Sequence, residues 1–187
     1  MMTLDAQGWV AGIRHTPSPN CDERPTDCDI SLLVIHNISL PPGQFGGGAI
    51  EDLFLNRLDP NAHPYYAGIA ALRVSAHFLI RRDGELVQFV SCLQRAWHAG
   101  ESSFAGRTRC NDFSVGIELE GSDVVAFAAA QYRTLARLTT GLRARLPLRA
   151  VRGHEHIAPG RKTDPGPHFD WTRFARQAHL PDSWLPR

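Results

Sequence analysis

The chain has 187 residues, and 20 lysines and arginines against 19 aspartates and glutamates leave a formal net charge of +1. This balance gives no electrostatic footprint for nucleic acid or an anionic membrane. The 43% hydrophobic and 21% charged residues exclude a disordered chain, and no apolar run approaches the ~20 residues of a membrane span. The unusual count is nine histidines. Histidine is the commonest metal ligand and titrates near neutrality, so composition already points to site chemistry.

The compartment is predicted from the first residues and from the cysteines. The segment from Met1 to Trp9 has neither a basic nor an apolar region, so we expect no secretory signal peptide. The four cysteines lack the C-x-x-C spacing of redox and zinc motifs, and we interpret them as reduced structural thiols. A metal pair formed by Cys21 and Cys28 is the alternative. We expect a cytoplasmic protein.

The first apolar run marks a central strand. Residues 1–30 lack periodicity and predict an irregular arm packed on a single domain that covers residues 1–187. Residues 31–36 form a short continuous apolar run, which is typical of a buried strand. His36 stands at the carboxyl end of this strand, where open α/β sheets bind their ligands.

Periodicity and turn residues predict the remaining elements in chain order. They are a loop over 40–48, a helix over 49–58, a loop over 59–70, strands over 74–80 and 85–90, a loop over 97–112, a strand over 114–120, a helix over 127–145, a strand over 148–153, a loop over 153–167 and a helix over 170–178. Asp83-Gly84 is a hairpin signal. Ser122 or Asp123 is a candidate cap for an earlier start of the long helix, and Asp170 for the last helix. The alternation predicts an α/β fold with a mixed central β-sheet flanked by helices.

Candidate ligands concentrate in residues 153–167, where three prolines and three glycines predict an ordered, non-helical loop. This loop carries His154, His156, Lys162 and Asp164. Two histidines and an aspartate, with His36 among them, would form a three-ligand zinc site with one open position. His154 and His156 could act as a pair only if both faced one side. Any single histidine is more often structural than ligating, so spacing leaves the ligand set open.

A second open choice concerns the strand over 114–120. Glu118 and Glu120 lie two residues apart and therefore share one face of this strand. A strand carboxylate is usually a surface group, and composition does not choose between the two.

Five blocks of sequence resemble the AmpD family of anhydro-N-acetylmuramyl-L-alanine amidases. They are VIHNISLPPGQFG at 34–46, RVSAH at 73–77, RAWHAG at 95–100, CNDFSVGIELEG at 110–121 and APGRKTDPGP at 158–167. The blocks occur in order over nearly the whole chain. This family belongs to a wider group of zinc amidases that includes T7-type lysozymes and peptidoglycan recognition proteins, and the resemblance implies their fold.

The resemblance also implies roles for individual residues. The implied zinc ligands are His36, His154 and Asp164, and the implied catalytic residues are Glu118, as acid-base carboxylate, and Lys162, which faces the developing oxyanion. The implied substrate-binding residues are Asn37, Arg73, Trp97, His98 and Arg109. The alternative role for Trp97 is packing in the core, and the alternative role for His98 is to hold its own loop. We expect His77 to be buried and hydrogen-bonded, and His156 not to be a ligand.

The implied activity is zinc-dependent hydrolysis of the amide between anhydro-N-acetylmuramic acid and L-alanine of the stem peptide in anhydro-muropeptides. This places the chain in peptidoglycan recycling, with an indirect influence on β-lactamase induction. One Zn²⁺ per chain, a small-molecule muropeptide substrate, a monomer, and neither nucleic-acid nor membrane partners are expected. The alternatives are a non-catalytic peptidoglycan-fragment binding module, an envelope amidase, which would need an export signal, and a zinc-dependent DNA binder, which the neutral charge disfavours.

Overall fold

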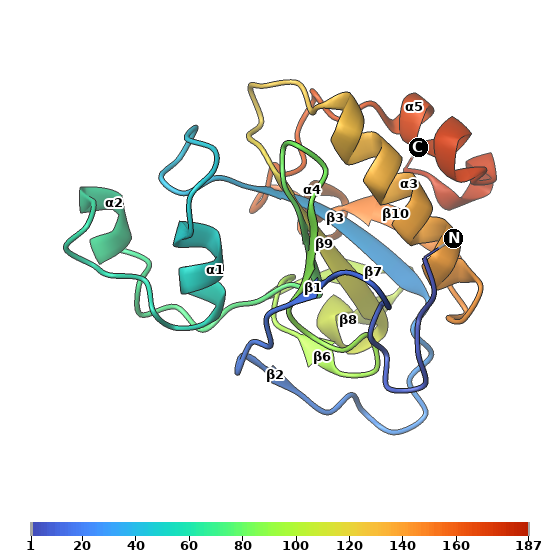
Figure 1. Ribbon diagram of the computed structural model, residues 1–187. Coiled ribbons are helices and arrows are strands. Elements are labelled where there is room, and N and C mark those ends of the chain that lie inside the picture. The colour runs from blue at the N-terminus through green and yellow to red at the C-terminus, as the bar shows by residue number, and fades with distance from the viewer. Residues whose placement is uncertain (1, 187) are drawn as a thin grey trace.

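A six-stranded mixed sheet forms the centre of the computed structural model, which describes residues 2–186 (Figure 1). In spatial order its strands are β1 (Arg14–His15), β5 (Leu86–Gln88), β4 (Phe78–Ile80), β9 (Ser114–Glu120), β3 (Leu32–Ile38) and β10 (Ala150–Gly153). Only the β4–β5 pair of this sheet is antiparallel. The carboxyl ends of β9, β3 and β10 therefore meet at one edge.

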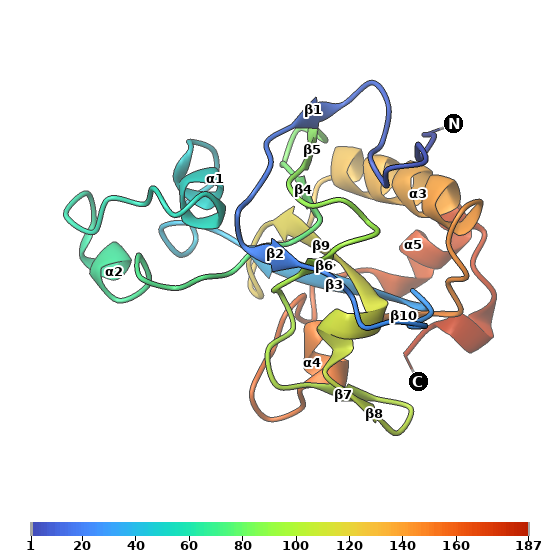
Figure 2. The ribbon, with the colours of Figure 1, turned by 90° about the horizontal axis from the view of Figure 1, so that it is seen from below.

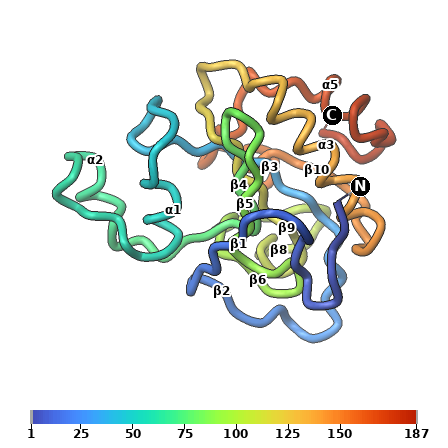
Figure 3. The backbone as a smooth tube through the Cα atoms, in the orientation of Figure 1, coloured from blue at the N-terminus to red at the C-terminus, as the bar shows by residue number. Residues whose placement is uncertain are grey.

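Helices α3 (Ala129–Arg143) and α5 (Trp171–Ala178) cover one face of this sheet (Figure 2). The other face carries α4 (His154–Ile157), the 3₁₀ turn η1 (Cys110–Phe113) and the hairpin of β7 (Ser103–Phe104) and β8 (Arg107–Thr108). The segment with α1 (Ala49–Phe54) and α2 (Pro64–Ala67) projects sideways from the sheet (Figure 3). The remaining elements are the pair β2 (Cys21–Asp22) and β6 (Arg95–Ala96) and the 3₁₀ turn η2 (Asp182–Trp184).

Strand alternation decides which side chains reach the site. On β3, Leu33 and Ile35 are fully buried in the core shared with α3 and α5. Leu32 and Val34 pack on the opposite face, in the cluster that includes Phe113. His36 continues this second row, so the residue that follows the apolar run in register lies on the face away from the long helices.

Most predicted elements are confirmed, with shorter bounds than the patterns suggested. The Asp83-Gly84 hairpin joins β4 to β5, and Gly84 adopts a φ of +93°, which suits glycine. Asp170 caps α5, since its side chain accepts a hydrogen bond from the Arg173 amide. The mixed sheet flanked by helices agrees with the predicted fold class.

Four local predictions are wrong. The long helix does not start near Ser122 or Asp123, because the Gln131 side chain instead accepts the amide of Ala128 and caps a start at residue 129. The 153–167 loop contains the helical turn α4, which precedes its prolines. The 59–70 and 97–112 loops likewise contain α2, β7, β8 and η1. Turns of four residues or fewer leave no periodic signal.

Two compositional predictions concern the whole chain. Within residues 2–186, no helix is long and apolar enough to cross a membrane. All four cysteines are free, with Cys92 and Cys110 buried and Cys21 and Cys28 half-buried. No disulfide therefore contributes to the stability of this fold.

Candidate active site

Three neighbouring parallel strands converge on the site. His36 on β3 and Glu118 on β9 are register partners, so their side chains emerge side by side from the same face of the sheet. His154 directly follows β10, which pairs with β3 on its other side. Asp164 lies on the loop after α4. The backbone amide of Glu155, on α4, donates a hydrogen bond to the Asp164 carbonyl. Sheet topology thus joins residues more than a hundred positions apart.

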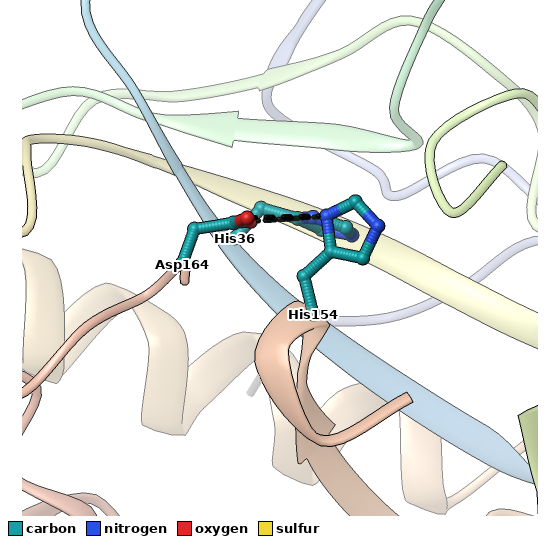
Figure 4. A group of neighbouring side chains, drawn as sticks. All are labelled: His36, His154 and Asp164. Carbon is teal, nitrogen blue, oxygen red and sulfur yellow. Dashed lines mark hydrogen bonds and ion pairs between the residues drawn. The ribbon is translucent and has the colours of Figure 1, made fainter. Parts of the chain in front are cut away.

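His36, His154 and Asp164 form a cluster that could hold a metal ion (Figure 4). The two Nδ1 atoms lie 3.0 Å apart, and Oδ2 of Asp164 lies 3.0 Å from the Nδ1 of His36 and 3.2 Å from that of His154. Two nitrogens and an oxygen bound to zinc at 2.0–2.2 Å with tetrahedral angles stand about 3.3 Å apart. The three donors fit that spacing closely.

The hydrogen bonds of the rings agree with metal ligation. The Ala99 carbonyl lies 3.0 Å from Nε2 of His154, and a carbonyl only accepts, so this nitrogen carries the proton. In a ring with only that proton, Nδ1 of His154 carries a lone pair that points into the cluster. Burial lowers the pKa of His36 to about 4, so the His36 ring is neutral at pH 7. A cation would satisfy both lone pairs and the carboxylate at once.

Glu118 and Glu120, which the sequence left equivalent, have different surroundings. Glu120 is 2% exposed and accepts from the backbone of Gly46 and Arg82, with Arg81 3.3 Å away. Glu118 borders the cavity, and within the described residues its buried Oε2 has no hydrogen-bond partner. Burial first, and then Asp164, raises the pKa of Glu118 well above the usual range, while Lys162 opposes the shift. Glu118 is therefore the carboxylate free to accept a proton.

A cavity of about 850 Å³ opens over this cluster, which is a size that holds a substantial small molecule. The three clustered residues, Glu118 and Lys162 all border it. Lys162 is exposed and borders the cavity from the loop that carries Asp164. Apolar side chains line the wall towards α1 and α2, among them Leu40, Leu53, Phe54, Ile69 and Leu72. One wall therefore offers charged groups and possible metal-ligand atoms, and another offers apolar contact.

The five predicted substrate-binding residues divide into two groups. Asn37, Trp97 and His98 border the cavity. Arg73 and Arg109 do not: the Arg73 guanidinium donates to carbonyls of its own segment, and Arg109, 69% exposed, pairs with Asp112. Neither arginine lines the cavity, although Leu72 and Val74, on either side of Arg73, do line it.

Asn37 and Trp97 also have structural partners. The Asn37 amide donates to Asp123 Oδ1 at 2.7 Å and to the Pro165 carbonyl at 3.1 Å, which ties the Asp164 loop to β3. The Trp97 indole donates to Asp22 at 3.1 Å and fixes the plane of its ring. Both residues are half-buried, so each combines a packing role with an exposed edge at the cavity.

The other two predicted histidines are placed as expected. His77 is fully buried, and its Nδ1 accepts from the Gly116 amide at 3.0 Å. His156 Nδ1 accepts from the Gly153 amide at 3.0 Å, so His156 caps α4 and is not part of the cluster.

Sequence reasoning missed residues that hold the site loops. Asp123 accepts from both Asn37 and Thr163, and so anchors the loop of Lys162 and Asp164. Arg161 donates to the Ala99 carbonyl at 2.8 Å and joins this loop to the 97–112 segment. Tyr65, 45% exposed, borders the cavity from α2. Only contacts between distant loops identify these residues, and no local pattern contains such information.

Comparison with known proteins decides the family. The family model described as N-acetylmuramoyl-L-alanine amidase matches residues 26–167. The chain belongs to this family. The amidase is 63% identical to 1,6-anhydro-N-acetylmuramyl-L-alanine amidase AmpD of Citrobacter freundii over 175 residues, which cover 92% of this chain and 93% of the relative. It is 59% identical to AmpD of Escherichia coli strain K12, over 90% and 93% of the two chains.

Solved structures support the same assignment. The crystal structure of a selenomethionine derivative of AmpD superposes on the amidase with a TM-score of 0.92, at 61% identity and with 94% of this chain and 99% of the other covered. AmiD from E. coli, solved in complex with the substrate anhydro-N-acetylmuramic acid-L-Ala-D-γ-Glu-L-Lys, matches with a TM-score of 0.58 and 31% identity, over 83% of this chain and 60% of AmiD. The predicted fold and family are confirmed.

Proposed function

We propose that this amidase hydrolyses the amide between anhydro-N-acetylmuramic acid and L-alanine of anhydro-muropeptides, with one zinc ion held by His36, His154 and Asp164. The observation that carries the proposal is the convergence of these three donors beside an unpartnered buried carboxylate, Glu118, in a cavity of about 850 Å³. The names of the AmpD relatives and the ligand in the AmiD complex supply the substrate class.

The chemistry needs a strong nucleophile and a stabilised oxyanion, since amides are poor electrophiles. Zinc bound at such a site lowers the pKa of water and polarises a carbonyl. Glu118 accepts the proton of the attacking water and returns it to the alanine amine, and its raised pKa suits both transfers. Lys162 donates a hydrogen bond to the tetrahedral oxyanion, an effect on the order of 3 kcal/mol for a well-aimed donor.

Substrate contacts follow from the walls of the cavity. The apolar wall and the exposed ring of Tyr65 offer a surface for the anhydro-sugar, and Trp97 and the free edge of Asn37 face the same space. Arg73 and Arg109 do not border the cavity, and their contact with substrate stays a prediction. The whole site comes from one chain, so we propose one domain acting as a monomer.

The reaction is placed in peptidoglycan recycling, which follows from the same substrate. Four free cysteines are compatible with a reducing compartment, so we propose the cytoplasm as its location. An indirect effect on β-lactamase induction would follow from the removal of anhydro-muropeptides.

The test is mass spectrometry of anhydro-muramyl-tripeptide incubated with the protein, with and without a zinc chelator. We expect free tripeptide and anhydro-muramic acid, no products with chelator, and recovery on adding zinc. His154→Ala should behave as the chelated protein does. Intact sacculus serves as the second substrate, and preference for it would favour an envelope amidase. Binding of anhydro-muramyl-tripeptide without its cleavage would instead support a binding module and overturn the proposal.

A further inference from the structure

We propose that the segment His98–Ala99, held by Asn111, positions both histidine ligands of the metal centre, the His98 ring orienting His36 and the Ala99 carbonyl orienting His154. The inference rests on the proposed zinc site and gives His98 a positioning role instead of the substrate contact that the resemblance implied. Four observations on different atoms of the segment carry it.

The first is a chain of hydrogen bonds behind His36. Its Nε2 lies 2.8 Å from Nδ1 of His98, and Nε2 of His98 lies 3.1 Å from the hydroxyl of Ser114. When His36 turns the Nδ1 lone pair to a metal, its Nε2 carries the proton and donates to His98. His98 then carries its own proton on Nε2 and donates to Ser114. Both nitrogens of His98 are thereby engaged, and neither is left for a substrate.

The second observation concerns His154. The carbonyl of Ala99, the next residue, lies 3.0 Å from Nε2 of His154 and accepts its proton. The segment 98–99 therefore binds the ring nitrogen of each ligand that faces away from the cluster. The His98 side chain binds Nε2 of His36, and the Ala99 carbonyl binds Nε2 of His154. Such outer partners fix the tautomer and the ring orientation of metal-bound histidines.

The third observation is the clamp on the segment itself. Oδ1 of Asn111, on η1, accepts from the amides of His98 at 3.2 Å and Ala99 at 2.8 Å. A single side-chain oxygen thus fixes both peptide groups. Arg161 donates to the Ala99 carbonyl as well, from the loop that carries Asp164. The position of the segment is therefore set by η1 and by the ligand loop together.

The fourth observation is the space made for the His98 ring. Gly116 lies on β9 directly under it, and a Cβ at Gly116 would stand 2.5 Å from Cγ and 2.6 Å from Nδ1 of His98. The φ of Gly116 is not in the left-handed region, so the glycine is needed for space and not for its backbone. The absence of a side chain at Gly116 thus leaves the space in which the His98 ring reaches His36.

The test compares two variants whose side chains branch in the same way at Cγ. His98→Asn retains an acceptor where Nδ1 stands, and His98→Leu removes it. Zinc affinity is measured by competition with a chromophoric chelator. Loss of such an outer partner typically weakens metal binding 10–100-fold, so we expect His98→Leu to bind zinc 10–100-fold more weakly than the unmodified protein and His98→Asn to recover most of that loss. Unfolding of each metal-free variant in urea controls for a general loss of packing.

A second pair tests the clamp by the same assay. Asn111→Asp keeps the accepting oxygen and Asn111→Leu removes it, so only the latter should weaken zinc binding. This pair also carries the test if a variant at position 98 does not fold. Equal zinc affinity for the Leu and Asn variants at position 98, whether unchanged or equally weakened, would overturn the positioning role. Absence of zinc binding by the unmodified protein would overturn the proposed metal site itself.

Discussion

Two carboxylates on one strand show how neighbours decide the role of a residue. Glu118 and Glu120 share a face of β9, yet Arg81 and two backbone amides hold Glu120, while Oε2 of Glu118 lacks a partner within residues 2–186. A buried carboxylate with satisfied oxygens is structural, whereas an unsatisfied one retains its capacity to take a proton. The role of each follows from what lies beside it.

The first prediction concerns Glu118→Gln. The variant should retain zinc, because residue 118 is not among the three clustered donors, and should lose turnover by about 10²–10⁴-fold, the usual share of a general base. Zinc content by elemental analysis and kcat on anhydro-muramyl-tripeptide are the measurements. Glu120→Gln is the matched control: it should mainly lower stability, since it weakens the contacts to Arg81 and Gly46. Full turnover by Glu118→Gln would contradict the assignment.

Lys162 gives the second prediction. Lys162→Met keeps the aliphatic stem and removes the donor, and we expect kcat to fall about 10²–10³-fold with zinc content unchanged. Because Lys162 is exposed, the urea unfolding midpoint should not move. A change confined to KM would show that the ammonium binds the ground state and does not stabilise the oxyanion.

At the scale of elements, ion pairs attach the projecting α1 segment to the sheet. Glu51 on α1 lies 2.7 Å from Arg14 on β1 and 2.6 Å from Arg81, which follows β4. The two hydrogen bonds from Arg14, followed by the one from Arg81, lower the pKa of Glu51 to about 2 against the opposing effect of burial. Since α1 supplies Leu53 and Phe54 to the cavity wall, these pairs also hold one side of the site.

The third prediction is a pH-dependent effect of Glu51→Gln. A carboxylate with a depressed folded pKa stabilises the fold above its unfolded pKa, which is 4.5 for an ordinary glutamic acid, and loses this contribution as the pH falls towards about 2. The variant should therefore be less stable than the unmodified protein at pH 7, and the difference should shrink between pH 4.5 and 2. Urea unfolding at several pH values measures it. Asp52→Asn, next on α1 and without an ion pair in the described residues, should show a smaller dependence.

Helix α5 supplies the fourth prediction. The Asp170 side chain accepts from the amide of Arg173 at 2.8 Å, which satisfies an otherwise unpaired donor of the first turn. Asp170→Ala should lower the free energy of unfolding by about 1 kcal/mol, and Asp170→Asn, which keeps an accepting oxygen, should lower it less. Chemical denaturation compares the two. Equal losses in both variants would show that the cap contributes little.

At the scale of the whole molecule, the site exists only when the sheet and the loops are assembled. The proposed zinc binds the folded chain in preference to the unfolded one, so it should raise stability by about 2.7 kcal/mol at a hundredfold excess over its dissociation constant. For a domain of this size, that corresponds to a rise in Tm of roughly 5–10 °C. Calorimetry with and without zinc tests this fifth prediction. His36→Ala should abolish the rise, and His156→Ala, outside the cluster, should preserve it.

Local patterns predicted the strands and helices that carry the site, because buried strands and amphipathic helices leave periodic apolar signals. They did not predict α2, α4 or the β7–β8 hairpin, whose spans of two to four residues are too short for such a signal. Arg73 and Arg109 lie in a matching block or beside one, and their side chains contact local carbonyls and Asp112, so their role in substrate binding stays a prediction.

The sequence by itself determined the family, the α/β class and the histidines worth examining, since these depend on residue identities and on periodicity along the chain. The nine histidines were a composition signal that marked no particular role. Tertiary structure decided which of them converge, which carboxylate stays unpartnered, and that Nδ1 of His98 lies 2.8 Å from Nε2 of His36. Those outcomes depend on parallel pairing of β9, β3 and β10 and on contacts between distant loops, which are set by three-dimensional packing and not by any local pattern.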